Sequence, residues 1–274
     1  MRVGTVTLGQ IATFLILFSL LPISSRAAVF WDDELESGNT GYPLMFTLPS
    51  CGGATSGNDT TNKVSGSGSL RLGYPSNDIT CGGFADRSFS ATTDLWGRFY
   101  IRLSPGFIVS PVATKIMNNS TDGGGVSFWW AMYGGSSNLM ITGQGYPPGI
   151  NAVNYFSNVG NGNLRTSPEG GFVCVETRIK LNTVGSADGV IEAYKNGVLV
   201  MNHTGIVMRT AGTSTETVRF IFNRMYRQYG QGDINYDRLA FGNTRIGCLG
   251  SIPAPSIPPP SNGSIAAPSN LSVR

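Results

Sequence analysis

One stretch of alternating residues has the side chains that bind sugars. Every second position of it is aromatic or carries a guanidinium: Trp96, Arg98, Tyr100 and Arg102. On a β-strand these side chains share one face, where rings can stack on sugars and guanidinium forks can bind carboxylates or sulfates. Arg178 and Lys180 could widen this face from a neighbouring strand. Alternatively, the strip is the ordinary outer face of a strand, with arginine stems packed over aromatic rings.

A second aromatic pair, Trp129 and Trp130, is adjacent in sequence. Neighbouring residues of a strand point to opposite faces, so at most one of the two can serve as a sugar platform. We take Trp129 as that candidate and expect the other indole to lie in the core.

Paired carboxylates for glycoside hydrolysis are not indicated. Such chemistry needs two acids aimed at one bond, but Glu34 and Glu36 lie together near the N-terminus and no Glu-x-Asp-x-x-Glu strand occurs. A hydrolase is therefore not expected.

The composition favours an all-β protein. The 274 residues include 37 glycines and 10% aromatics, while only 13% are charged, against about 25% in typical domains. This excludes long helical bundles and coiled coils. The net charge of +3 without basic runs also excludes nucleic acid as a partner.

Runs with period two recur through the middle of the chain and predict strands. They lie at 69–73, 96–103, 114–117, 126–133, 138–142, 172–182, 190–195, 198–202, 217–223 and 234–241. Asn196-Gly197 between two of them predicts a type I′ hairpin. We therefore expect residues 28–250 to form one two-sheet antiparallel jelly-roll sandwich.

Both ends of the chain differ from this middle part. Residues 1–27 combine an early arginine, a short apolar run and a small-residue exit, the pattern of a secretory signal peptide. Residues 251–274 are rich in proline and serine and predict a linker or tail. We expect a monomer secreted to the periplasm or the cell exterior, without a membrane partner after cleavage.

Export to an oxidising compartment lets the four cysteines pair. Three connectivities are possible, of which we prefer Cys51–Cys81 and Cys174–Cys248. A zinc site is the weaker alternative, because the chain has no Cys-x-x-Cys and one histidine.

Several phrases together resemble the concanavalin A-like lectin and glucanase jelly rolls, and among them bacterial polysaccharide lyase-type, heparin lyase I-like modules. They are Trp96-Gly-Arg-Phe-Tyr-Ile-Arg-Leu-Ser-Pro-Gly-Phe107, Thr114-Lys-Ile116, Glu176-Thr-Arg-Ile-Lys-Leu-Asn182, Asp188-Gly-Val-Ile-Glu-Ala-Tyr-Lys-Asn-Gly197 and Tyr236-Asp-Arg-Leu-Ala240. The resemblance implies a curved sheet that binds extended sugar chains, and a structural Ca²⁺ between Glu36 and Asp237, whose oxygen ligands suit that ion. Otherwise no cofactor is expected.

A lyase would need a group that neutralises the uronate, a base for the C5 proton and an acid for the leaving oxygen. Arg98, His203 and Tyr226 or Tyr229 are the candidates. His203 has no polar partner nearby in sequence, so we expect it to lie elsewhere, leaving Tyr229 as base and acid. The family's Gln-x-His pair is missing. We therefore place polysaccharide binding first, a polysaccharide lyase second, and an adhesion or structural module third.

Overall fold

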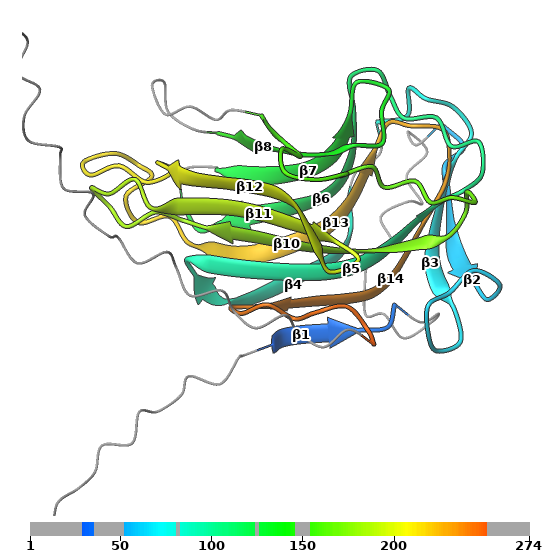
Figure 1. The fold of residues 1–274 in the computed structure, drawn as a ribbon, viewed down its shortest axis with the longest axis horizontal. Coiled ribbons are helices and arrows are strands. Elements are labelled where there is room, and N and C mark those ends of the chain that lie inside the picture. Colours follow the sequence, from blue (N-terminus) through cyan, green and yellow to red (C-terminus); the bar gives the residue numbers. More distant parts are fainter. Residues whose placement is uncertain (1–28, 36–51, 81–82, 124–125, 146–153, 251–274) are drawn as a thin grey trace, which may run out of the picture.

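The fold is a sandwich of two antiparallel β-sheets (Figure 1). A computed structural model describes residues 29–35, 52–80, 83–123, 126–145 and 154–250, with backbone only for 83–86. No helix occurs in these ranges, and so none that could cross a membrane. The predicted signal peptide, the tail, Cys51, Cys81 and Glu36 lie outside the described residues.

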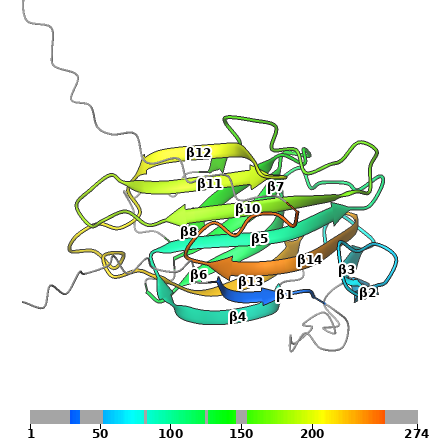
Figure 2. The ribbon, with the colours of Figure 1, turned by 60° about the horizontal axis from the view of Figure 1, so that its bottom comes forward.

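Sheet A has eight strands, in the order β12-β11-β10-β5-β14-β3-β2, with β1 paired to β14 (Figure 2). Their bounds are β1 Val29–Asp33, β2 Thr55–Asp59, β3 Ser69–Tyr74, β5 Asp94–Leu103, β10 Phe172–Lys180, β11 Gly189–Lys195, β12 Val198–Ile206 and β14 Gly232–Gly242.

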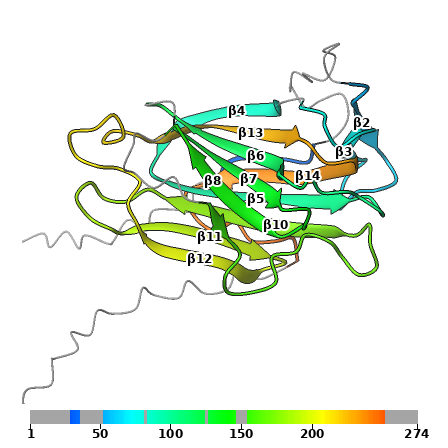
Figure 3. The ribbon, with the colours of Figure 1, turned by 90° about the horizontal axis from the view of Figure 1, so that it is seen from above.

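Sheet B has six strands, in the order β4-β13-β6-β7-β8-β9, and faces the viewer in Figure 3. Their bounds are β4 Gly83–Thr92, β6 Ala113–Thr121, β7 Ser127–Tyr133, β8 Leu139–Gln144, β9 Tyr155–Phe156 and β13 Phe220–Gln228. The predicted jelly-roll sandwich is thus confirmed. The pattern missed β1, β2, β4 and β9, which are short or lack apolar alternation.

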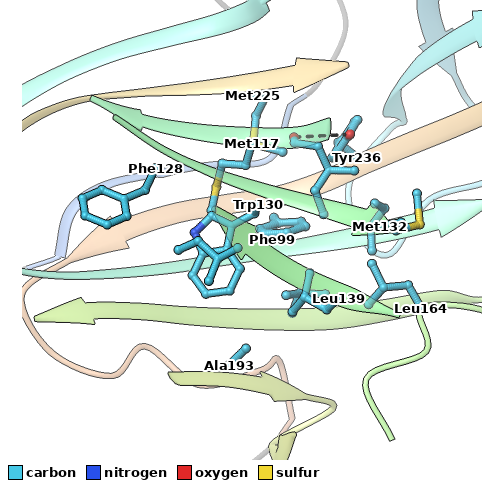
Figure 4. Packing of buried hydrophobic residues seen from close by; sticks show 14 of the residues in the cluster. Phe99, Met117, Phe128, Trp130, Met132, Leu139, Leu164, Ala193, Met225 and Tyr236 are labelled. Carbon is cyan, nitrogen blue, oxygen red and sulfur yellow. Dashed lines mark hydrogen bonds between the residues drawn. The ribbon is translucent and has the colours of Figure 1, made fainter. Parts of the chain in front are cut away.

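The core lies between the sheets, where each strand turns every second side chain inward. Phe99 from sheet A and Trp130 from sheet B are both fully buried there (Figure 4). The indole N–H of Trp130 donates to Asn119 Oδ1 at 3.0 Å. Trp129 points the other way, as the alternation predicted.

The predicted hairpin is also confirmed. β11 and β12 are joined through Asn196 and Gly197, which have φ angles of 49° and 81°. Positive φ at both positions is what a type I′ turn requires, and Asn-Gly tolerates it.

The segment 243–249 after β14 turns back across the outer face of sheet A, and we call it the strap. Figure 2 shows it in orange over β5 and β10. The predicted disulfide Cys174–Cys248 ties its end to β10, with Cα atoms 6.0 Å apart. Arg245 on the strap pairs with the buried Glu176 at 2.9 Å, and the Gly247 N–H donates to the same carboxylate at 2.7 Å. The strap therefore belongs to the folded body.

Candidate functional site

The strip that the sequence predicted to bind sugars lies on the outer face of sheet A, beneath the strap. Trp96, Arg98 and Tyr100 are 7%, 4% and 8% exposed. Arg98 donates to Asp32 at 3.0 Å and to the Arg238 carbonyl at 3.1 Å. The Leu249 N–H donates to the Tyr100 hydroxyl at 2.5 Å. Because these three side chains are almost fully buried, their predicted contact with substrate is replaced by packing against neighbouring residues.

The remaining cations of that face are held by neighbours. Arg102 donates to the Gly170 carbonyl at 2.7 Å. Arg178 binds Asp94 and Glu192 and lies over the Trp96 ring, while Lys180 pairs with Asp188 at 3.6 Å. Arginine stems over aromatic rings are what the alternative interpretation of this strip predicted.

The outer face of sheet B carries a second set of aromatic, cationic and amide side chains. Strand register places Arg224, Asn118, Trp129 and Thr142 in one row across β13, β6, β7 and β8. The next row runs through Gln228, Lys115, Ala131 and Met140. Tyr226 lies between the two rows on β13. We call these residues the sheet-B face.

Lys115 lies at the centre of the sheet-B face. Its Nζ is 4.1 Å from the centroid of the Trp129 ring and 6.0 Å from that of Tyr226. The two rings meet edge to face with centroids 4.6 Å apart. A half-buried amine is therefore held beside a tyrosine and on a tryptophan.

Burial shifts both titrating groups of this cluster. It lowers the pKa of the Lys115 amine, because a charged ammonium loses hydration there. Burial also raises the pKa of Tyr226, with Arg224 opposing and Tyr229 adding to the rise. The lysine thus gives up its proton more readily than usual, whereas the tyrosine retains its own.

The strand that carries Tyr226 is anchored from inside the sandwich by the next residue, Arg227. This fully buried guanidinium donates to the Leu72 carbonyl and to the carbonyls of Gly230 and Gly232 at 3.1 and 2.8 Å. It also lies 3.8 Å from the centroid of the Tyr74 ring. Burial lowers the pKa of Arg227 to about 10, so it stays charged at neutral pH.

Asn118 is positioned by its neighbours on the same face. It is 4% exposed, and its Oδ1 accepts from the Ser120 hydroxyl at 2.6 Å. Its Nδ2 donates to the Phe128 carbonyl at 3.4 Å. This amide lies opposite Arg224 in the register, and its hydrogen bonds fix it within the sheet-B face.

The structure does not bring the predicted catalytic residues together. Arg98 lies on β5 of sheet A, whereas Tyr226 lies on β13 of sheet B and Tyr229 follows the end of that strand. Tyr229 has a φ of 65° and its N–H donates to the Ile79 carbonyl at 2.8 Å. His203 lies on β12, where Nε2 is 2.9 Å from the Phe156 carbonyl. It is outside the cluster, as expected.

Of the predicted set, Tyr226 and Trp129 do lie together. Sequence reasoning missed Lys115, Asn118 and Arg224. A signal for them existed: Lys115 stands in the Thr114-Lys-Ile116 phrase, and Arg224 is two residues before Tyr226, the spacing of one strand face.

Asp237 of the predicted Ca²⁺ pair is fully buried, and its Oδ2 accepts from the Val64 and Ser65 N–H groups at 2.6 and 3.4 Å. A buried carboxylate beside a loop is a ligand of the kind that Ca²⁺ takes. The described residues contain no cluster of three or more metal-binding side chains.

No protein-family model matches this chain, and no curated protein matches it. Solved structures do resemble it. The protein described as "Cellulose induced protein, Cip1" is 19% identical, with 80% of this chain and 99% of that one covered and a TM-score of 0.53. An endo-β-1,4-glucuronan lyase from the fungus Trichoderma reesei is 14% identical, covering 79% and 96%, with a TM-score of 0.55.

The PL-14 alginate lyase from Aplysia kurodai is 13% identical, covering 78% of this chain and 99% of that one, with a TM-score of 0.52. At these identities the likeness concerns the fold. Together with the two antiparallel sheets, it shows that the chain has the concanavalin A-like jelly-roll fold found in polysaccharide lyases.

Proposed function

We propose that this protein binds a uronate-containing polysaccharide on the sheet-B face and cleaves it by β-elimination. The observation that carries the proposal is the half-buried Lys115 amine held against Trp129 and beside Tyr226. The candidate base (Lys115), the candidate acid (Tyr226) and a ring on which a sugar can stack (Trp129) are therefore next to one another. The lyases named above share the fold and support the substrate class.

β-Elimination removes the C5 proton of a uronate and expels the oxygen at C4. A base takes the proton, the C5–H electron pair forms the C4–C5 double bond, and the C4–O bond breaks. An acid protonates the departing oxygen, so atoms and charge balance. A cationic or amide group near the carboxylate stabilises the negative charge that develops there.

The sheet-B face offers one group for each role. Lys115, whose pKa burial lowers, is the base, and Tyr226, whose pKa burial raises, is the acid. Arg224, two residues before Tyr226 on the same face of β13, neutralises the carboxylate. Trp129 supplies a ring on which a sugar can stack.

These assignments predict how the rate of cleavage changes with pH. The rate rises with pH as Lys115 loses its proton and falls once Tyr226 loses its own. The rising limb lies below the ordinary range of a lysine, because burial lowers the pKa of Lys115. Lys115→Met should abolish this limb, which a profile of kcat/KM against pH will show.

The central experiment incubates the full chain with glucuronan and with alginate, and follows the ultraviolet absorbance of the unsaturated product. Tyr226→Phe and Lys115→Met should each lower kcat by about 10²–10⁴-fold. Tyr194→Phe and Lys180→Met are the matched controls, because both lie on the outer face of sheet A. An equal loss in control and test variants would overturn the site.

Binding without cleavage is the second candidate, and the cation–π contact of a charged Lys115 with Trp129 favours it. In that case no absorbance develops with any polymer, yet Trp129→Ala weakens retention on glucuronan or alginate in affinity electrophoresis. If neither polymer is bound or cleaved, the polysaccharide proposal fails.

The proposal also includes secretion as a monomer and a structural Ca²⁺ at Asp237. The Cys174–Cys248 disulfide is compatible with an extracellular or periplasmic location. Asp237 would contribute an oxygen ligand beside the loop that holds Val64. Unfolding with and without Ca²⁺ tests this: a Ca²⁺-dependent rise in Tm that Asp237→Asn abolishes supports the site.

A further inference from the structure

Two exposed aromatic side chains meet at the β9 end of sheet B. Tyr133 and Phe156 are 45% and 42% exposed, and their rings lie edge to face with centroids 5.3 Å apart. The other large hydrophobic side chains that are exposed in the described part of the chain are aliphatic. Isolated exposed aliphatic groups are ordinary, but paired exposed rings mark a contact surface.

The pair continues the sheet-B face. Phe156 lies opposite Met140, in the same row as Ala131 and Lys115. Tyr133 follows Trp129 and Ala131 at alternate positions of β7, so it shares their face. From β6 to β9 are three strand spacings of ~4.8 Å, or about 14 Å. Phe156 is thus three strands away from Lys115 and Tyr133 one strand away, so the pair extends from Lys115 along a path that crosses the strands.

We propose that Tyr133 and Phe156 form a distal platform for the sugar residues of a long chain whose scissile bond lies at Lys115 and Tyr226. The platform rests on the proposed function and adds a preference for long substrates over short ones. Rings of this kind stack on the apolar face of a pyranose. They contact sugars that do not react, so they contribute to binding of long chains.

His203, which the cleavage chemistry does not use, positions this platform. The Phe156 carbonyl can only accept, so Nε2 of His203 donates to it at 2.9 Å. The imidazole also packs on the neighbouring Tyr155 ring, with centroids 4.9 Å apart. Asn158, two residues after Phe156, also exchanges two hydrogen bonds with the backbone of Asn202 on β12. His203 therefore fixes the short strand that carries Phe156.

The test compares long and short substrates. The double variant Tyr133→Ser/Phe156→Ser should raise KM for polymeric glucuronan or alginate about tenfold. Its kcat, and all constants for the shortest oligomer cleaved, should stay unchanged. Tyr133→Phe keeps the ring and Val198→Ser removes an exposed aliphatic group of β12; both should match the unsubstituted protein. His203→Ala should raise the polymer KM, and His203→Gln, which keeps a donor, should restore it.

The outcomes separate the two proposals. If the unsubstituted protein neither cleaves nor binds any length of chain, the proposed function fails. If it is active but the double variant alters long and short substrates equally, or alters neither, the platform is overturned. A loss of folded protein in the double variant, seen by near-ultraviolet circular dichroism, would also contradict it, because exposed rings should not support the fold.

Discussion

The outer faces of the two sheets carry the same kinds of side chain, yet their surroundings differ. On sheet A, Arg178 lies 5.1 Å from the centroid of the Trp96 ring; on sheet B, Lys115 lies 4.1 Å from that of Trp129. Arg178 is neutralised by two carboxylates, Asp94 and Glu192. The aromatic and cationic pattern therefore indicates which faces could bind a sugar, and burial and ion pairs make sheet A the poorer candidate.

The strap accounts for the difference. It places Cys248, Arg245 and Leu249 on sheet A, where they bind Cys174, Glu176 and Tyr100 in turn. Interactions of this kind hold a fold together. Substitutions on sheet A should therefore change stability, and substitutions on the sheet-B face should change activity.

The largest effect on stability should come from the disulfide. Cys174→Ala with Cys248→Ala opens a loop of 74 residues, and should lower the free energy of unfolding by about 4 kcal/mol. Urea unfolding measures this. At a temperature where the variant is folded, its kcat should equal that of the unsubstituted protein; a kcat lowered as far as that of Lys115→Met would break the comparison.

Glu176→Gln should have the next largest effect. Its carboxylate is 1% exposed and accepts from Arg245 and from the Gly247 N–H. Removing one partner of such a pair costs about 3 kcal/mol or more, because the other charge loses its neutraliser. Thermal unfolding checks this, with Glu192→Gln on the more exposed pair as the milder control. Equal shifts in the two variants would contradict a special role for the strap.

Low pH should lower the free energy of unfolding by a smaller amount, through Asp59 at the end of β2. Burial alone would raise the pKa of Asp59, but hydrogen bonds from Asn62, Asn235 and Thr61 lower it from 3.8 to about 2. A depressed pKa contributes stability above pH 4 and loses it as the pH falls from about 4 to 2. Because Asp59 is partly exposed, we expect about 1 kcal/mol or less. Asp59→Asn should flatten this part of the stability profile, and an unchanged profile would refute the assignment.

The smallest effect on stability should come from the sheet-B face itself. Lys115→Met removes a cation–π contact and retains most of the apolar stem, so the free energy of unfolding should change by about 1 kcal/mol or less. Chemical denaturation measures it alongside Lys180→Met. A loss as large as that of Glu176→Gln would mean that Lys115 is structural, and the division between the sheets would not hold.

Much of the fold follows from alternation along the chain. Phe99 and Trp130 face inward because every second residue of a strand must, and Asn196-Gly197 turns because few other pairs tolerate positive φ twice. The site was harder to predict. The Arg98 strip satisfies the same local pattern as the Trp129 cluster. Contacts with Asp32, with ion-paired neighbours and with residues 243–249 bury the strip. These contacts are long-range, and no local pattern contains them.

Register explains the other misses. Lys115 and Arg224 are 109 positions apart in sequence, and the pairing of β6 with β13 places them in separate rows of one sheet face. A one-residue slip would turn either side chain to the other face. Residue types identified Tyr226, and strand alternation identified Trp129, without identifying the partners of either.

The strap also determines the direction in which the chain leaves the sandwich. Leu249 is bonded to Tyr100 and Cys248 to Cys174, so the departure point at Gly250 is fixed on the sheet-A side. The thickness of the two packed sheets, about 10 Å between their planes, separates it from Lys115. Attachment of the protein to a surface at that point would place sheet A toward the surface and the sheet-B face toward solvent. Immobilisation through the C-terminal end should therefore preserve access to a polymeric ligand.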